Sequence, residues 1–349
     1  MRVLVTGHNG YLGAVMVGVL HTGGHEVVGL DTYLFGACTF GEPTPDIPSL
    51  RMDVRDVQAS DLMGFDAVVH LAALSNDPLG DLDAELTYAI NHRASVRLAR
   101  LAREAGVKRF LFSSSCSLYG AASTDALLTE TADFNPVTAY GASKVLVEQD
   151  VAQLATDDFS PTFLRNATAY GVSPRLRCDL VVNNLVAYAL TSGVIVLKSD
   201  GTPWRPLVHA EDIARAFLAV LNAPRELVHN QAFNVGQSSE NYRISQLAEL
   251  TRAVVPGCRV EYAEGAGPDP RCYRVSCEKL ASTLPEFQPA WTVQRGIEQL
   301  YRAYRHCGMT AADFHGPRYQ RIEHVKRLLA AGELDPSLRW RSAALVNAH

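Results

Sequence analysis

The 349-residue sequence contains no apolar run that approaches the ~20 residues needed to cross a bilayer. Its first residues, Met-Arg-Val-Leu-Val, lead directly into a strand-like run and lack the pattern of a signal peptide. We therefore expect a cytoplasmic protein that has no membrane partner.

Cysteine motifs and an excess of basic charge are also absent. The seven cysteines form no Cys-x-x-Cys motif, and their number is odd, so we expect reduced thiols and no structural metal. The formal net charge is −5, whereas a surface that binds nucleic acid is usually basic. We expect no nucleic-acid partner, and the charge leaves open a local basic pocket for a small anion.

What the sequence does contain is a regular alternation of short apolar runs with helical stretches. The expected strands are residues 3–5, 26–31, 50–54, 67–73, 109–115 and 162–166. Helices are expected between them, at 11–21, 85–105 and 140–155. Such alternation is typical of parallel crossover units, and it predicts an α/β fold whose sheet is covered by helices on both faces.

Three glycines lie between the first strand and the first helix, in the sequence VTGHNGYLG. Gly7 allows a tight turn, Gly10 lets the backbone approach a pyrophosphate, and Gly13 lets the helix pack against the sheet. The diphosphate would then meet free N–H groups and the positive end of the helix dipole. Asp31 ends the second strand, close to the spacing at which a carboxylate binds ribose hydroxyls. This context favours a dinucleotide site over a glycine-rich turn without a ligand.

The residues around Asp31 also indicate which dinucleotide is bound. A carboxylate at this position repels a 2′-phosphate, and residues 32–35, Thr-Tyr-Leu-Phe, supply no cation to bind one. The sequence therefore predicts NAD rather than NADP. Asp53 ends the third strand, where it could line the adenine pocket or be a solvated turn acid.

A tyrosine and a lysine lie four residues apart in AYGASK, so Tyr140 and Lys144 share one face of a helix. A lysine and a positive nicotinamide nearby would lower the pKa of the tyrosine, which could then act as a base. The preceding strand ends in the serine-rich run SSSCSLYG, and a serine there could hold a substrate oxygen that changes its charge.

Together these motifs resemble those of an extended short-chain dehydrogenase/reductase of the NAD-dependent nucleotide-sugar epimerase/dehydratase family. The resemblance covers roughly residues 1–300 and includes TGHNGYLG, HLAA, SSSCSLYG, YGASK, RNATAYG, RPLVHAEDIA, FNVG and DPRCY. It implies a Rossmann-type doubly wound parallel sheet with an interleaved smaller C-terminal substrate domain. The NAD-binding domain would span 1–166 with 207–237 returning to it, and 167–206 and 238–349 would bind the nucleotide sugar.

The resemblance also implies a role for each matching residue. Tyr140 resembles the catalytic base, Lys144 its partner on the nicotinamide ribose, and Ser115 the residue that binds the reacting sugar oxygen. The residues implied to contact NAD are Gly7, Asn9, Gly10, Tyr11, Leu12, Gly13, Asp31, Asp53, Val54, Leu71, Ala72, Ala73, Asn91, Ser113, Tyr140 and Lys144. Those implied to contact a nucleoside-diphosphate sugar are Ser75, Ser117, Asn166, Asn184, Arg205, Asp269, Arg271 and Tyr273.

Residues 115–117, Ser-Cys-Ser, bear on the reaction. The 4,6-dehydratases of the family carry Thr-Asp-Glu there, and the branches that epimerise C3 and C5 place a cysteine where this chain has Ser117. Cys116 is one residue away and so faces the other side of the strand. A threonine, chemically close to Ser117, occupies the position in 4-epimerases, which favours a 4-epimerase. The alternatives are an NAD(P)-dependent nucleotide-sugar 4-ketoreductase or dehydrogenase/dehydratase and, more distantly, a non-catalytic NAD-sensing protein, against which Tyr140 and Lys144 argue.

Three expectations concern the remaining parts of the chain. Family members pair through two helices, which implies a homodimer through the helices at 96–105 and 140–155. The loops 74–82 and 170–180 are expected to set the sugar specificity. Residues 308–340 lie beyond the resemblance, and we interpret their basic residues as a solvated helix face or a dimer-side cap rather than as contacts to substrate phosphates. These basic residues are Arg318, Arg321, Lys326 and Arg327.

Overall fold

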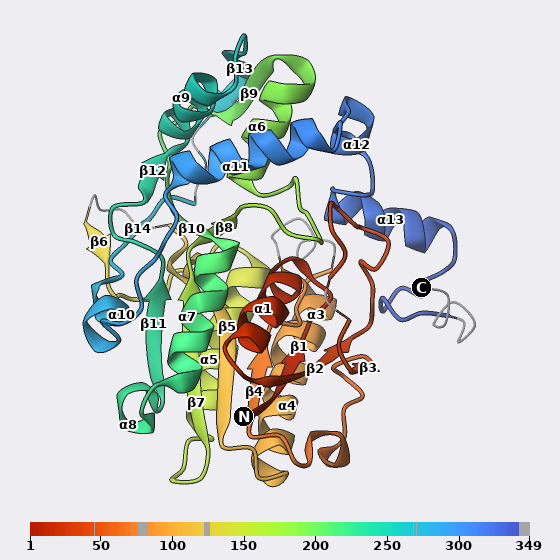
Figure 1. Ribbon diagram of the computed structural model, residues 1–349, viewed down its shortest axis with the longest axis vertical. Coiled ribbons are helices and arrows are strands. Elements are labelled where there is room, and N and C mark those ends of the chain that lie inside the picture. The colour runs from red at the N-terminus through yellow and green to blue at the C-terminus, as the bar shows by residue number, and fades with distance from the viewer. Residues whose placement is uncertain (45, 76–82, 122–125, 268, 270, 342–349) are drawn as a thin grey trace.

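A seven-stranded parallel sheet forms the centre of the protein, as the computed structural model shows (Figure 1). The structure describes residues 1–44, 46–75, 83–121, 126–267, 269 and 271–341. The strands, in the order in which they lie in the sheet, are β11 (Gln231–Val235), β7 (Ser160–Asn166), β5 (Arg109–Ser115), β4 (Ala67–His70), β1 (Arg2–Thr6), β2 (Glu26–Asp31) and β3 (Ser49–Arg51). The chain winds outward from β1 in one direction and from β4 in the other, so the order reverses between these two strands. The predicted doubly wound α/β fold is confirmed.

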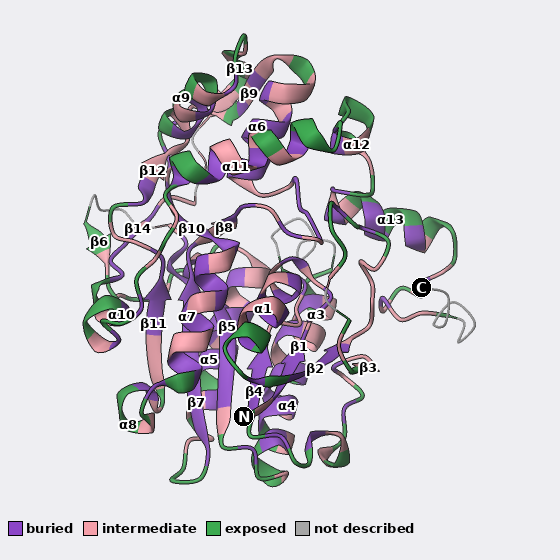
Figure 2. Cartoon of the chain, viewed as in Figure 1, coloured by how far each residue is buried: buried purple, intermediate pink, exposed green. Residues whose placement is uncertain are grey.

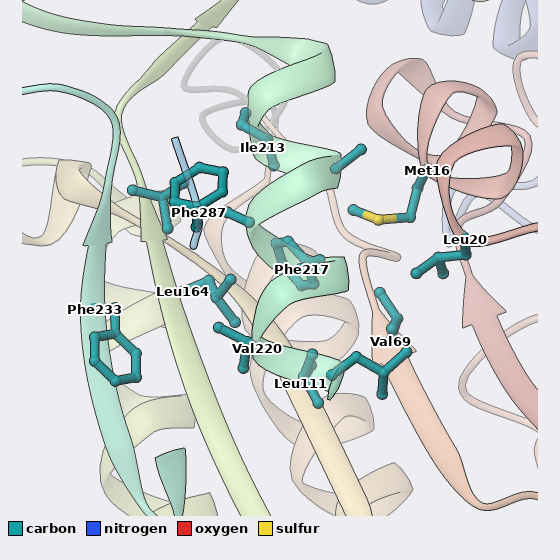
Figure 3. Close-up of a cluster of buried hydrophobic side chains, with 14 of the residues drawn as sticks. Met16, Leu20, Val69, Leu111, Leu164, Ile213, Phe217, Val220, Phe233 and Phe287 are labelled. Carbon is teal, nitrogen blue, oxygen red and sulfur yellow. The ribbon is translucent and has the colours of Figure 1, made fainter. Parts of the chain in front are cut away.

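Helices cover both faces of this sheet because its strands are apolar on both sides. In β5, Phe110 and Phe112 point to one face and Leu111 to the other, and all three are buried. On the Leu111 face lie α1 (Tyr11–Thr22) and α7 (Ala210–Asn222), which pack against each other and against the strands (Figure 3). On the other face lie α4 (Ala94–Glu104) and α5 (Ala139–Ala152). In Figure 2 most of the strands of this sheet carry the colour of buried residues.

A second group of elements lies beyond the carboxyl ends of the parallel strands, at the top of Figure 1. It contains a sheet of β12 (Asn241–Arg243), β10 (Trp204–His209) and β8 (Thr168–Tyr170), and a pair of β13 (Arg259–Gly267) and β9 (Val194–Ser199). The helices α6 (Val181–Ser192), α9 (Ile244–Val254) and α11 (Val293–His306) share an apolar cluster with these strands. The group faces the carboxyl ends of the strands, and residues from both groups line one cavity.

Short elements complete the described chain. They are η1 (Ala59–Leu62), η3 (Cys116–Tyr119), β6 (Leu127–Leu128), β14 (Arg274–Val275), α8 (Arg225–Val228), α10 (Glu278–Thr283), α12 (Ala311–His315) and α13 (Arg321–Ala330). No helix in the described ranges has both the length and the apolar character that crossing a membrane requires.

The single helix predicted over 85–105 is wrong, because the structure interrupts it. α3 (Ala84–Thr87) runs into a π-helical turn, η2 (Tyr88–Arg93), before α4 begins. A π-turn accommodates one extra residue per turn and is frequent near functional sites. Asn91 lies in this turn, is 1% exposed, and exchanges hydrogen bonds with both backbone groups of Leu74. The irregular turn therefore holds the loop that follows β4.

Candidate functional site

A cavity of about 910 Å³ opens where β1, β2, β4, β5 and β7 end, at the reversal of the sheet order. Ligands of open α/β sheets bind at such a point. The predicted residues that line the cavity are Gly7, Gly10, Tyr11, Leu12, Gly13, Asp31, Asp53, Val54, Leu71, Ala72, Ala73, Ser75, Ser113, Ser115, Ser117, Tyr140, Lys144, Asn166, Asn184, Arg205, Asp269, Arg271 and Tyr273. The fold thus brings the residues predicted to contact NAD and those predicted to contact the nucleotide sugar together around one cavity.

Asn9 and Asn91 are the predicted site residues that do not line this cavity. The backbone N–H of Asn9 donates to Asp31, and its side-chain oxygen accepts from Arg175 at 2.7 Å. Asn91 lies beneath the loop after β4 and bonds to its backbone. Both residues therefore hydrogen-bond to residues that surround the cavity instead of lining it.

Two positions of the glycine loop, Gly7 and Gly13, have no space for a side chain. Gly7 has a φ of +74°, and a Cβ on it would lie 2.8 Å from the backbone nitrogen of Ala72. A Cβ on Gly13 would lie 2.1 Å from the carbonyl oxygen of Gly7 and 2.6 Å from the Cα of His8. Gly13 thus lets α1 approach the turn after β1. Because the first N–H groups of a helix have no intrahelical partner, this turn fits a pyrophosphate.

Asp31 ends β2 and Asp53 lies two residues after the end of β3, and both line the cavity. Asp31 accepts the backbone N–H of Tyr33 at 2.7 Å and that of Asn9 at 3.0 Å. Burial raises the pKa of Asp31, and the nearby His8 and the two N–H groups oppose this rise. Burial acts on Asp53 in the same sense, but hydrogen bonds from Arg55, with an ion-pair distance of 2.6 Å, lower the pKa of Asp53 overall. Asp53 is therefore a paired acid in the cavity wall.

Tyr140 and Lys144 lie in the first turns of α5, which is capped by the Thr138 side chain. The Nζ atom of Lys144 is 5.6 Å from the centre of the Tyr140 ring and donates to the Ser113 carbonyl at 2.7 Å. Lys144 is 3% exposed. Burial lowers its pKa to about 7, an effect that the charge of Glu148 opposes. The pair has the geometry of a tyrosine whose proton is influenced by a neighbouring amine.

Two serines face the same cavity from the end of β5. Ser115 ends the strand and Ser117 lies in η3, with 2.6 Å between their hydroxyl oxygens. The Ser115 oxygen also accepts the backbone N–H of Ser117 at 3.1 Å. Cys116 between them is fully buried, and its thiol donates to the Arg165 carbonyl. At the end of β5, Ser115 and Ser117 therefore line the cavity with their hydroxyl groups, whereas the Cys116 thiol does not line it.

The opposite end of the cavity is rich in arginine. Arg205 donates to Asp269 at 2.7 Å and also to the Arg271 carbonyl. Arg271 bonds the same carboxylate through two nitrogens. Burial alone would raise the pKa of Asp269, but these hydrogen bonds and charges lower it. The guanidinium groups are held in place, as a site for a diphosphate requires.

Arg177 is a residue of the cavity that the sequence motifs did not single out. It is 5% exposed, forms an ion pair with Asp179 at 2.9 Å and donates to the Ser75 hydroxyl at 3.1 Å. Its positive charge also interacts with Tyr140. It lies in the loop 170–180 that was expected to shape the pocket, and the PRLR run there is the signal that could have identified it. The other such loop, 74–82, lies outside the described residues from 76 onward.

The interpretation of the C-terminal basic residues needs a correction at Arg321. Arg318, Lys326 and Arg327 are exposed, but Arg321 is 2% exposed and lines the cavity. Its guanidinium lies 4.3 Å from the centre of the Phe35 ring and donates to the Arg175 carbonyl. Periodicity alone does not distinguish it from the other basic residues, because only the packing of α13 against the loop after β2 buries it.

Comparisons with known proteins agree with this geometry. The family model described as "NAD dependent epimerase/dehydratase family" matches residues 3–236. A UDP-glucose 4-epimerase of Corynebacterium glutamicum is 30% identical over 305 residues, which cover 81% of this chain and 90% of that protein.

Solved structures show the same similarity. MoeE5 in complex with UDP-glucuronic acid and NAD has a TM-score of 0.76 and 26% identity, covering 88% of this chain and 99% of that chain. DesIV, a dTDP-glucose 4,6-dehydratase from Streptomyces venezuelae solved with NAD and TYD bound, has a TM-score of 0.76 and 25% identity, covering 89% and 99%. With the glycine loop, Asp31 and the Tyr140–Lys144 pair in one cavity, these matches establish that the chain is an NAD-dependent enzyme of the extended short-chain dehydrogenase/reductase class and belongs to the NAD-dependent epimerase/dehydratase family.

Proposed function

We propose that the protein is a 4-epimerase of a nucleoside-diphosphate sugar. One observation carries the proposal: Ser115, Ser117, Tyr140 and Lys144 meet the glycine loop in one cavity that also holds an arginine-rich end. NAD, when bound, supplies the chemistry of accepting a hydride and returning it. The residues of the chain must then hold the sugar and move one proton.

Tyr140 is proposed to take the proton from the C4 hydroxyl and to give it back after the sugar has turned in the cavity. The phenolate form is favoured by two neighbouring cations, Lys144 and Arg177, whose positions follow from the contacts above. The hydroxyls of Ser115 and Ser117 are placed to hydrogen-bond the oxygen whose charge changes. These five residues account for proton transfer and for the stabilisation of that oxygen.

The acids of the cavity favour epimerisation over dehydration. Removing water from a sugar requires a side chain that protonates the leaving hydroxyl. Among the described residues, the acids that line the cavity are Asp31, Asp53, Asp179 and Asp269, and each accepts hydrogen bonds from an arginine or from backbone N–H groups. None follows β5, where Ser115 and Ser117 stand. A 4-ketoreductase would use the same residues but would have to exchange its cofactor in every turnover.

The nucleotide end of the substrate is assigned to the arginine-rich wall. Arg205 and Arg271 are proposed to bind the diphosphate, with Tyr273 and Asp269 close to the nucleotide. Asn166 and Asn184, which line the same cavity, are proposed to orient the sugar. Support comes from the tethered guanidinium groups, of which Arg205 is buried and Arg271 is partly exposed, and which suit a doubly charged phosphate pair.

A panel of substrates tests the proposal. The NAD-loaded protein is incubated with UDP-, TDP-, GDP- and CDP-sugars, and products are separated by chromatography while absorbance follows NADH. We expect one pair of C4 epimers to interconvert without net formation of NADH. Stoichiometric consumption of NADH or NADPH with a 4-keto sugar would instead establish the reductase, and loss of water from the sugar would establish a dehydratase.

A further inference from the structure

The segment from Gln320 to Trp340, which we call the C-terminal clasp, runs along the cofactor end of the cavity. Figure 1 shows its helix α13, in blue, beside the red loop that follows β2. Gln320, Arg321, Ile322 and Leu338 of the clasp line the same cavity as Asp31 and Asp53. The clasp lies beyond the motifs that identify the family, so the family pattern assigns it no role.

One set of contacts fastens the clasp to the chain immediately after Asp31. The indole N–H of Trp340 donates to the carbonyl of Thr32 at 2.8 Å. The Nε2 atom of His324 lies 2.9 Å from the carbonyl oxygen of Leu34 and donates to it. These bonds join the clasp, near both of its ends, to the loop that directly follows Asp31. Asp31 is the residue that we expect to bind the adenosine ribose.

A second set fastens the clasp to the chain after Asp53. Arg55, which holds the Asp53 carboxylate, also donates to the carbonyl of Ser337 at 2.9 Å. Arg339 forms an ion pair with Asp56, with a hydrogen bond of 2.9 Å between Nη2 and Oδ1. The residues on either side of position 338 are therefore bound to the segment that follows β3 and Asp53.

Leu338 stands between these fastened residues in a strained conformation. Its φ is +60°, a left-handed value that is uncommon for a leucine, and its side chain is 7% exposed. Asp335 builds the turn, because its carboxylate accepts the N–H groups of Ser337 and Arg339, and its carbonyl accepts that of Leu338 at 2.9 Å. Such strain persists where the surroundings impose it and is concentrated at ligand sites.

We propose that the clasp is the outer wall of the adenosine site, where Leu338 packs against the adenine of NAD, and that the clasp must open before NAD can leave. The apolar side chains of Met52, Val54 and Ile322 line the same cavity and suit a flat heterocycle. In this proposal, the left-handed turn at Leu338 directs its side chain toward the cavity. The proposal rests on the cofactor alone and is independent of the sugar and of the reaction.

The test compares full-length variants loaded with NAD. Leu338→Gly removes the side chain but keeps the turn, because glycine adopts positive φ without strain. Leu338→Met keeps an apolar side chain of similar volume, and Trp340→Phe removes the N–H that bonds Thr32 and replaces the indole with a smaller ring. Lys326→Ala is the matched control, because Lys326 lies on α13 but is exposed, and its ion pair is with Glu323 on the same helix. Released NAD is trapped by alcohol dehydrogenase and ethanol and followed as NADH.

We expect NAD to leave Leu338→Gly at least tenfold faster, and Trp340→Phe severalfold faster, than the unmodified protein. Leu338→Met and Lys326→Ala should stay within twofold of it. Binding of 5′-AMP to nucleotide-free protein should weaken at least tenfold in Leu338→Gly. Release rates within twofold in both Leu338→Gly and Trp340→Phe would overturn the proposal, and so would faster release with unchanged AMP affinity. Should Leu338→Gly fail to fold, Trp340→Phe decides the question alone.

Discussion

His70, a buried histidine at the end of β4, is expected to make the stability of the protein depend on pH. Its Nε2 atom lies 2.7 Å from the Ser95 hydroxyl, and its Nδ1 atom lies 2.6 Å from the Thr6 hydroxyl. Because Ser95 donates to the carbonyl of Asn91, Nε2 must donate to Ser95. In the neutral ring, Nδ1 then accepts from the Thr6 hydroxyl. Burial, assisted by the charge of Lys144, lowers the pKa of His70 from 6.5 to about 3.

The sign and size of the effect follow from this shift. Above pH 6.5 the ring is neutral in both the folded and the unfolded chain, and the contribution to stability is complete. Below it the unfolded chain binds a proton that the folded protein does not, so stability falls until the pH approaches 3. At ~1.36 kcal/mol per pKa unit, the loss between pH 8 and pH 5 is about 2 kcal/mol.

Urea unfolding of nucleotide-free protein, followed by tryptophan fluorescence at pH 8 and pH 5, measures this loss. His70→Gln keeps a donor and an acceptor but does not titrate, so its free energy of unfolding should fall by about 2 kcal/mol less than that of the unmodified protein. His21→Gln, at an exposed position in α1, is the control for the substitution itself. Equal losses in His70→Gln and the unmodified protein, within ~0.5 kcal/mol, would refute the neutral buried ring.

Two further predictions concern the buried charges and the glycine loop. Glu148→Gln removes the partner of Arg165, whose Nη2 lies 2.7 Å from the carboxylate with both side chains almost fully buried, and should cost about 3–5 kcal/mol in urea unfolding. A loss below ~1 kcal/mol would mean that the pair contributes little. Gly13→Ala brings a Cβ to 2.1 Å from the Gly7 carbonyl oxygen, so it should weaken NAD binding at least ~10-fold in calorimetry, ~1.4 kcal/mol or more. Its control is Gly18→Ala on the same helix, where a Cβ meets nothing within 4 Å; equal NAD affinity in both variants would contradict the role of the loop.

The fold could be predicted from the sequence because two of its signals are local. Apolar runs such as EVVGLD form β2 over the residues expected, and the glycines require a turn that few other structures use. The π-turn at Asn91 could not be predicted from local periodicity, because the hydrogen bonds that accompany it join Asn91 to Leu74, 17 residues earlier in the sequence. Local periodicity therefore identified the helix but not its interruption.

The candidate site divides in the same way. Tyr140 and Lys144 are one helical turn apart, so their proximity follows from spacing alone. Arg177 and Leu338 reach the cavity only through tertiary packing, which no local pattern records. The division of the chain at residues 166, 206 and 237, the homodimer and the cytoplasmic location stay predictions.

Tyr140→Phe gives the most direct test of the central claim that Tyr140 moves the proton in a hydride-transfer reaction. The variant removes one hydroxyl and leaves the ring beside Lys144. With the substrate found in the sugar-nucleotide panel, kcat should fall about 10²–10⁴-fold or more, while NAD affinity measured by calorimetry stays within twofold. Tyr262→Phe, at an exposed position outside the cavity, should leave both unchanged. Full activity in Tyr140→Phe would contradict the account and remove this residue from the mechanism.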